Sequence, residues 1–209
     1  MKPRSFRSPA DVARELGGVV AHGRALADLF VRGRLTAHDR ELITVAVSRV
    51  NGCAGCTFVH ERWALRAGVS DEELRALELG ELQRLGSRQR SLVVYATARA
   101  EMRFAEPAPA EVLDIARATL APAEIAAAEA LARAMTFANL AVSTAEALPA
   151  RVRRSAPGGA GGTRATGEAD SAPGARQVPD EPVGCQARDR IERARLLEEM
   201  RGPRDDRQL

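Results

Sequence analysis

The chain has 209 residues, a net charge of +3 and only 3% aromatic residues, and Lys2 is its single lysine. Basic residues are interspersed with acidic ones and the aromatic side chains are few, so a nucleic-acid partner is not expected. The N-terminus lacks a basic start followed by an apolar run, and no apolar stretch approaches ~20 residues. We therefore predict a cytoplasmic protein with no membrane span, whose thiols are kept reduced.

The first third of the chain predicts two or more helices. Residues 1–9 are expected to be a flexible N-terminus, and from Asp11 onward apolar residues recur at spacings of three and four. Thr36 followed by Asp39 predicts a capped helix start. Asn51-Gly52 predicts the end of that helix, because glycine readily adopts the left-handed conformation found there.

The middle of the chain continues in the same way. A helix is expected from about Cys53 to Ala67, and Gly68 would stop it. Ser70 with Glu73 forms a capping box that opens a short helix, and another helix is expected to begin at Ser87.

Two further helices are predicted before the composition changes. Pro107 and Pro109 break the chain, and a helix near 111–120 follows. Pro122 suits the first turn of a longer, alanine-rich helix. Since no long stretch alternates with period two, we predict an all-α fold over residues 10–150.

The C-terminal part has a different composition. Residues 151–188 are rich in glycine, proline and alanine, so we predict a disordered linker there. Residues 189–209 regain a thin apolar edge, which predicts a short helix and tail, either a surface helix or a docking peptide. Cys185 lies in the linker.

One segment concentrates reactive side chains. Glu41, Cys53, Cys56 and His60 follow the pattern E-x11-C-x2-C-x3-H. If residues from Cys53 onward are helical, Cys56 and His60 share a face and Cys53 lies close enough to Cys56 for a disulfide. A cysteine at a helix N-terminus has a thiol pKa below its ordinary ~8.5, because the helix dipole and free N–H groups stabilise the thiolate.

This motif resembles that of the alkylhydroperoxidase D-like proteins, within the carboxymuconolactone decarboxylase superfamily. The resemblance spans roughly residues 10–148 and includes residues 67–74 and 135–140. It implies an alkylhydroperoxidase D-like helical bundle that assembles as a homotrimer or homohexamer. Some members carry a histidine between the two cysteines, whereas Ala54 and Gly55 stand there in this chain.

The resemblance also implies a role for each residue of the motif. Cys56 matches the peroxidatic cysteine and Cys53 the resolving one, while His60 and Glu41 match the proton relay. The implied function is a thiol-dependent hydroperoxide reductase in antioxidant defence, with a hydroperoxide as substrate. A lipoyl or thioredoxin-like protein would supply the reducing dithiol, and neither a cofactor nor a metal is expected.

Other interpretations of the same residues remain open. A C-x-x-C pair with His60 and Cys185 would be one possible zinc ligand set, and a structural disulfide is another. The second functional hypothesis is a lyase of the carboxymuconolactone decarboxylase type, which needs acid and base groups rather than a dithiol. The third is a non-enzymatic redox sensor or interaction module. His22 and His38 lack such a context and are expected to be surface or structural residues.

Overall fold

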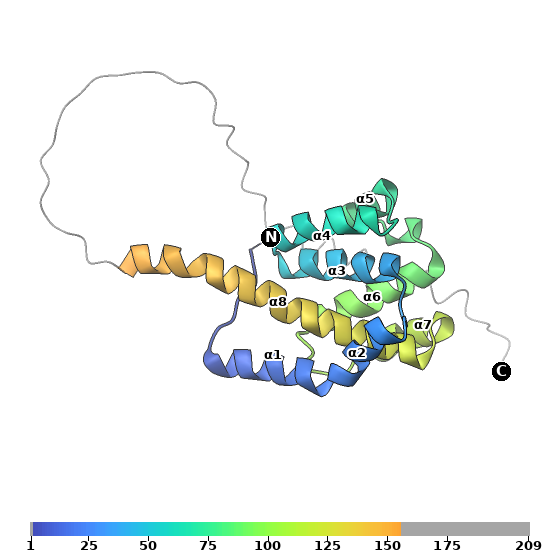
Figure 1. Cartoon of the computed structure of the whole chain (residues 1–209), viewed down its shortest axis with the longest axis horizontal. Helices are drawn as coiled ribbons and strands as arrows, with labels where there is room; N and C mark the ends of the chain where they lie inside the picture. Colours follow the sequence, from blue (N-terminus) through green and yellow to red (C-terminus); the bar gives the residue numbers. More distant parts are fainter. Residues whose placement is uncertain (1, 156–209) are drawn as a thin grey trace, which may run out of the picture.

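The computed structural model describes residues 2–155, with side chains through Ala147, and over this range it contains α-helices, one 3-10 turn and no strand (Figure 1). The predicted all-α fold is therefore confirmed for the described part of the chain. The elements are α1 (Pro9–Ala21), α2 (Gly23–Val31), α3 (Ala37–Asn51), α4 (Ala54–Arg66), α5 (Asp71–Leu79), η1 (Leu82–Arg84), α6 (Ser87–Glu101), α7 (Ala110–Thr119) and α8 (Pro122–Ser155).

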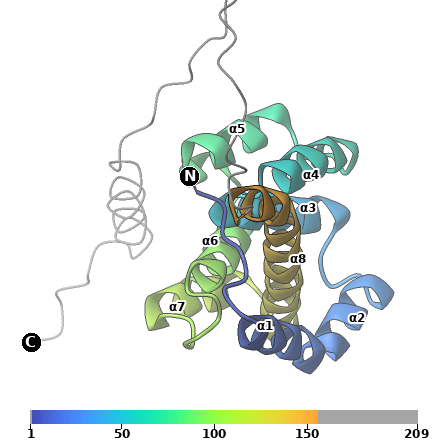
Figure 2. The same cartoon turned by 90° about the vertical axis from the view of Figure 1, so that its left-hand side faces the viewer.

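Helix α3 lies at the centre of the bundle. Every residue from Leu42 to Ser48 is buried, and α3 packs against α4, α6 and α8. Figures 1 and 2 show α4 and α5 on one side of α3 and helices α1, α2 and α8 on the other. A helix that is enclosed on most sides has apolar residues around its whole circumference rather than along one stripe.

The apolar core has two parts. The larger one lies mainly among α3, α6, α7 and α8 and the smaller one among α3, α4, α5 and α6. In the smaller part, apolar residues of α4 and α5 pack against α3. This packing orients α4, the helix that carries His60. Its buried members are Leu42, Val45, Ala46, Ala64, Val69, Ala76, Leu85 and Val93.

The predicted helix boundaries agree with the capping residues. The Thr36 hydroxyl accepts from the Asp39 N–H at 3.1 Å, and the Ser70 hydroxyl accepts from the Glu73 N–H at 3.2 Å. Both starts are complete capping boxes, and Pro122 is the first residue of α8. The side chains thus satisfy N–H groups that a helix start leaves without partners.

A buried ion pair joins α6 to α8. Arg99 donates from Nε and Nη2 to the two carboxylate oxygens of Glu129, each at 2.9 Å. The Tyr95 hydroxyl donates to the same carboxylate at 3.2 Å, and Arg133 donates to it at 2.9 Å. Burial alone would raise the pKa of Glu129, but the Arg99 hydrogen bonds and the neighbouring positive charges hold this pKa below its ordinary value.

The N-terminal segment differs from the expectation for residues 1–9. Arg4 donates its N–H to the Asn51 carbonyl at 3.0 Å, and Phe6 donates its N–H to the Thr144 hydroxyl at 2.9 Å. The Phe6 ring also packs against that of Phe137, with centroids 5.5 Å apart. These contacts hold the segment against the bundle, so the prediction of a flexible start is wrong for these residues.

The C-terminal boundary also shifts. Helix α8 continues to Ser155, so residues 151–155 are helical although they were assigned to the linker. The rest of that linker and the predicted helix at 189–209 lie outside the described residues.

The prediction that no apolar stretch is long enough to span a membrane does not hold for α8. Residues Pro122–Ala147 have the length and mean hydropathy, 1.3, that would suffice to cross a membrane. In this structure 50% of the most apolar window is buried against the bundle, and the core helix of a soluble protein satisfies the same test of length and composition.

Candidate functional site

The C-x-x-C motif begins at a tight turn between α3 and α4. Gly52 ends α3 in the left-handed conformation, with φ 68°, and the next N–H, from Cys53, returns to the Ser48 carbonyl at 3.1 Å. Cys53 is then the N-cap of α4, and its sulfur accepts from the Cys56 N–H at 3.4 Å. The predicted placement of the cysteines at a helix N-terminus is confirmed.

The two cysteines differ in their access to solvent. They are joined by a disulfide, with Cα atoms 5.3 Å apart. Cys53 is only 2% exposed, whereas Cys56 is half-buried. Cys56 is therefore the sulfur that a molecule arriving from solvent reaches more easily.

His60 lies one helical turn beyond Cys56 on α4 and contacts Glu41 of α3. The distance from His60 Nδ1 to Glu41 Oε2 is 3.1 Å. A carboxylate only accepts, so Nδ1 carries the proton of this hydrogen bond and Nε2 is left as the basic nitrogen of a neutral ring. The exposed fractions of the two side chains are 17% and 22%, which places the pair at the edge of the bundle.

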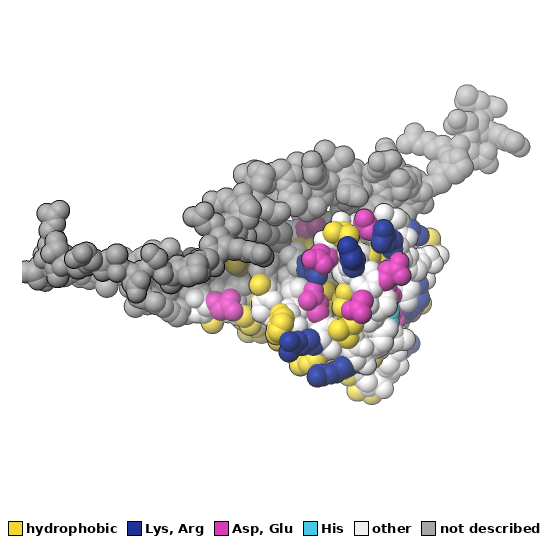
Figure 3. All heavy atoms as spheres, turned by 90° about the horizontal axis from the view of Figure 1, so that it is seen from above, with side chains coloured by type: hydrophobic (Ala, Val, Ile, Leu, Met, Phe, Trp, Pro, Cys, Tyr) yellow, Lys and Arg dark blue, Asp and Glu magenta, His cyan; other side chains and the backbone are white. Residues whose placement is uncertain are grey.

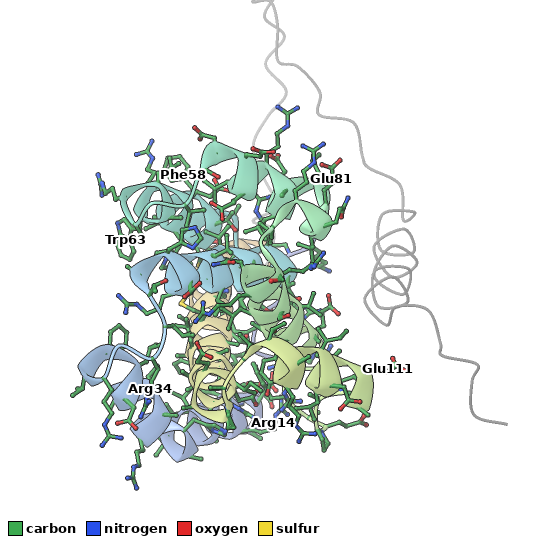
Figure 4. All side chains as sticks on the ribbon, turned by 90° about the vertical axis from the view of Figure 1, so that its right-hand side faces the viewer. Arg14, Arg34, Phe58, Trp63, Glu81 and Glu111 are labelled. Carbon is green, nitrogen blue, oxygen red and sulfur yellow. A yellow bond between two sulfur atoms is a disulfide. The ribbon has the colours of Figure 1, made fainter. Side chains whose placement is uncertain are left out.

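Aromatic side chains flank the motif, and the sequence analysis did not assign them a role. The Trp63 ring meets the His60 ring edge to face, with centroids 5.0 Å apart, and fixes the second side of the imidazole. Trp63 is 49% exposed and Phe58 55% exposed, and both project outward from α4 (Figure 4). The i, i+3 spacing of His60 and Trp63 was the available signal for this contact.

A buried polar cluster supports the turn from beneath. Ser48 donates to the Asn139 side-chain oxygen, and Asn51 donates to the Thr136 hydroxyl, each at 3.3 Å. All four residues are fully buried between α3 and α8. Since Asn51 immediately precedes Gly52 in the chain, this cluster ties the redox turn to α8. The segment 135–140 had been singled out only for its family resemblance.

Two other segments approach the same turn. A Cβ atom on Gly52 would lie 3.3 Å from both the Lys2 carbonyl oxygen and the Pro3 Cα, so the N-terminal segment passes directly over the turn. On α8, Glu146 Oε1 lies 3.7 Å from the position that a Cβ on Gly55 would occupy. Because Gly55 has no side chain, the Glu146 carboxylate approaches the backbone directly before Cys56.

Residues 19–98 match the model of the carboxymuconolactone decarboxylase family. This segment belongs to that family. The matched residues include Glu41, Cys53, Cys56 and His60 and extend from α1 into α6, so the predicted alkylhydroperoxidase D-like superfamily is confirmed. No curated protein matches the chain.

A shallow groove lies on the face formed by α4 and α5, within the segment that matches the family. One hollow of about 510 Å³ is lined by Phe58, Leu65, Leu74, Leu79 and charged residues, and a second of about 390 Å³ reaches Gly52 and Ala54. Arg49 and Glu61 form an ion pair that borders both. Acidic, basic and hydrophobic side chains are interspersed on this side of the molecule (Figure 3).

The sequence also raised the question of a metal site and of the roles of His22 and His38. Within the described residues, no group of three or more His, Cys, Asp or Glu side chains is arranged to hold a metal ion, and Cys185 lies outside them. His22 contacts the Gly18 carbonyl at 2.8 Å and His38 contacts Glu73 at 3.2 Å, so both have structural contacts, as predicted.

Proposed function

We propose that this protein is a thiol-dependent hydroperoxide reductase that uses the Cys53–Cys56 pair. The observation that carries the proposal is the arrangement of α4: a disulfide-bonded cysteine pair occupies its N-terminus, and a His60–Glu41 pair follows one turn later. Membership of the carboxymuconolactone decarboxylase family agrees with either alkylhydroperoxidase-like or decarboxylase-type chemistry. The dithiol favours alkylhydroperoxidase-like chemistry, because decarboxylation of a lactone acid requires acid and base groups and no pair of thiols.

The first half of the proposed reaction oxidises Cys56. Its thiolate attacks the O–O bond of a hydroperoxide, forming a sulfenic acid and releasing an alkoxide that takes up a proton to leave as an alcohol. His60 Nε2 is the nitrogen available to remove the thiol proton and to return it to the leaving oxygen. Glu41 keeps the other ring nitrogen protonated and stabilises the imidazolium that forms in between.

The second half closes and reopens the disulfide. The Cys53 thiol attacks the sulfenic sulfur, the S–S bond forms and water leaves. An external dithiol then reduces the bond by exchange: it returns to the pair the two electrons that the peroxide removed and becomes a disulfide itself. We propose a lipoyl or thioredoxin-like protein as this dithiol, and a cytoplasmic location, where thiols are kept reduced.

We further propose that the protein works as a homotrimer or homohexamer. Several large apolar side chains of α1 and α2 are exposed, and a second copy would remove them from water. They are Leu16, Val20, Phe30 and Val31.

Turnover of an organic hydroperoxide with a small dithiol tests the proposed function. We expect Cys56→Ser to abolish turnover, because the other cysteine of the pair, Cys53, is only 2% exposed and out of reach of the peroxide. Cys53→Ser should stop the cycle at a sulfenic acid on Cys56, which a sulfenic-acid-specific label and peptide mass spectrometry would detect. Cys185→Ser is the matched control and should keep wild-type turnover.

Three results would argue against the proposal. If Cys56→Ser and Cys53→Ser both keep wild-type turnover, the pair is not catalytic. If turnover survives alkylation of every thiol, the decarboxylase-type lyase takes its place. If the pair reacts once with peroxide and no dithiol restores it, the protein is a stoichiometric redox sensor.

A further inference from the structure

We propose that Glu146 lowers the reduction potential of the Cys53–Cys56 pair through its negative charge, so that a given dithiol reopens less of the disulfide at equilibrium. Because this tuning matters only if the pair cycles between disulfide and dithiol, it rests on the proposed function.

Glu146 reaches the redox turn from the far end of α8. Figures 1 and 2 show α8 passing the end of the bundle where α3 finishes and α4 begins. Oε1 of Glu146 is 3.7 Å from the Cβ position of Gly55, the residue directly before Cys56. Adding a Cα–Cβ bond of ~1.5 Å and one Cα–Cα step of 3.8 Å places the carboxylate within ~9 Å of the Cys56 Cα. This separation is about one Debye length at physiological ionic strength.

The other charged groups around the turn are mostly paired. His60 is hydrogen-bonded to Glu41, and Arg49 forms an ion pair with Glu61. Two basic residues of the N-terminal segment also lie near the turn: the Lys2 carbonyl oxygen lies over Gly52, and the Arg4 guanidinium donates to the Ala100 carbonyl at 3.1 Å.

The carboxylate of Glu146 has no such neutralising contact with any side chain among residues 2–147. Among the described residues it forms no ion pair with a cation, and its side chain is exposed. Within the described residues, its charge therefore acts on the N-terminal end of α4 without an ion-paired cation.

Reduction creates a new negative charge beside this carboxylate. The disulfide takes up two electrons and one proton, the S–S bond breaks, and the products are the Cys53 thiol and the Cys56 thiolate. The free N–H groups at the start of α4 stabilise that thiolate, whereas the like charge of Glu146 opposes it. The disulfide carries no charge and is unaffected, so Glu146 shifts the equilibrium toward the oxidised pair.

The expected effect follows from the separation of the charges. At ~9 Å, with an effective dielectric between the values for a protein surface and for water, the repulsion corresponds to a three- to tenfold change in the equilibrium constant. A tenfold change in a two-electron couple is 29.6 mV, so the reduction potential should change by about 15–30 mV.

Redox equilibration with glutathione measures this change directly. The experiment uses the full chain with Cys185→Ser as the background, and alkylation with mass spectrometry counts the reduced molecules. We expect Glu146→Gln to raise the equilibrium constant for reduction three- to tenfold and Glu146→Lys to raise it further. The difference between Glu146 and Gln should shrink in ~1 M salt, where charges at this separation are screened.

Glu111→Gln on α7 is the matched control, because it removes an exposed carboxylate far from α4 (Figure 4). Equal potentials for all Glu146 variants, an equal shift in Glu111→Gln, or a shift that salt leaves unchanged would overturn the proposal. Peroxide is absent from this measurement. A chain that fails to turn over hydroperoxide but shows the shift would therefore refute the proposed function and leave the electrostatic effect intact.

Discussion

Tyr95 offers an optical test of the buried ion pair between α6 and α8. It is the only tyrosine in the chain, so near-ultraviolet absorbance follows its ionisation without labelling. Burial, and then the charge of Glu129, raise the pKa of Tyr95 from 10.0 to about 12. The phenolate is disfavoured because it would lose water and face the carboxylate that the neutral hydroxyl now binds at 3.2 Å.

This shift has a defined consequence for stability. The pKa of Tyr95 is higher in the folded than in the unfolded chain, so its contribution is complete below about pH 10 and is lost as the pH rises toward 12. A pKa change of two units corresponds to roughly 2–3 kcal/mol in total. Between about pH 9 and about pH 11, linkage gives a loss of ~1.3 kcal/mol in the free energy of unfolding.

The assay combines an absorbance titration with urea unfolding at both pH values. We expect Tyr95 to titrate near 12 when folded and near 10 in denaturant, and Tyr95→Phe to lack the alkaline loss. Lys2 is the only lysine, so few other groups titrate in this range. A folded-state midpoint near 10, or an unchanged alkaline loss in Tyr95→Phe, would refute the reasoning.

Two further predictions concern stability. Glu129→Leu should lower the free energy of unfolding by ~3–5 kcal/mol in urea melts, because it leaves the buried Arg99 without its counter-charge, whereas the Arg99→Leu, Glu129→Leu double variant should recover most of the loss. A double variant no better than the single one would contradict this. Gly52→Ala should cost ~1 kcal/mol more than Gly80→Ala, since both glycines have positive φ, 68° and 74°, but only a Cβ on Gly52 meets the Lys2–Pro3 backbone. Equal losses would show that the N-terminal segment does not constrain the turn.

The local signals in the sequence predicted the helices of residues 9–147 well. Thr36, Ser70 and Pro122 mark helix starts, and Gly52 marks a helix end, in the structure as in the sequence. These signals work because they act locally. A capping side chain accepts from N–H groups at the start of its helix, and a left-handed glycine lets nearby N–H groups reach the last carbonyls of its helix. The position of His60 next to the C-x-x-C turn is local in the same sense, because Cys56 and His60 are four residues apart on one helix.

The contacts that depend on tertiary packing were not predictable. Nothing in the first nine residues shows that Arg4 and Phe6 bind the α3 terminus and α8, because their partners lie far away in the sequence. The pairing of Asn51 with Thr136 has the same character. The hydrogen bond of Glu41 to His60 came from the motif resemblance rather than from periodicity, since it joins two different helices.

The path of the N-terminal segment has a practical consequence for handling the protein. Because Lys2 and Pro3 lie against Gly52, a purification tag fused ahead of them would emerge beside the cysteine pair. Such a tag would compete with peroxide and reductant for approach to Cys56, and a polyhistidine tag would place metal-binding imidazoles beside the cysteine thiols. Kinetic constants and redox potentials should therefore be measured on chains whose N-terminus is native.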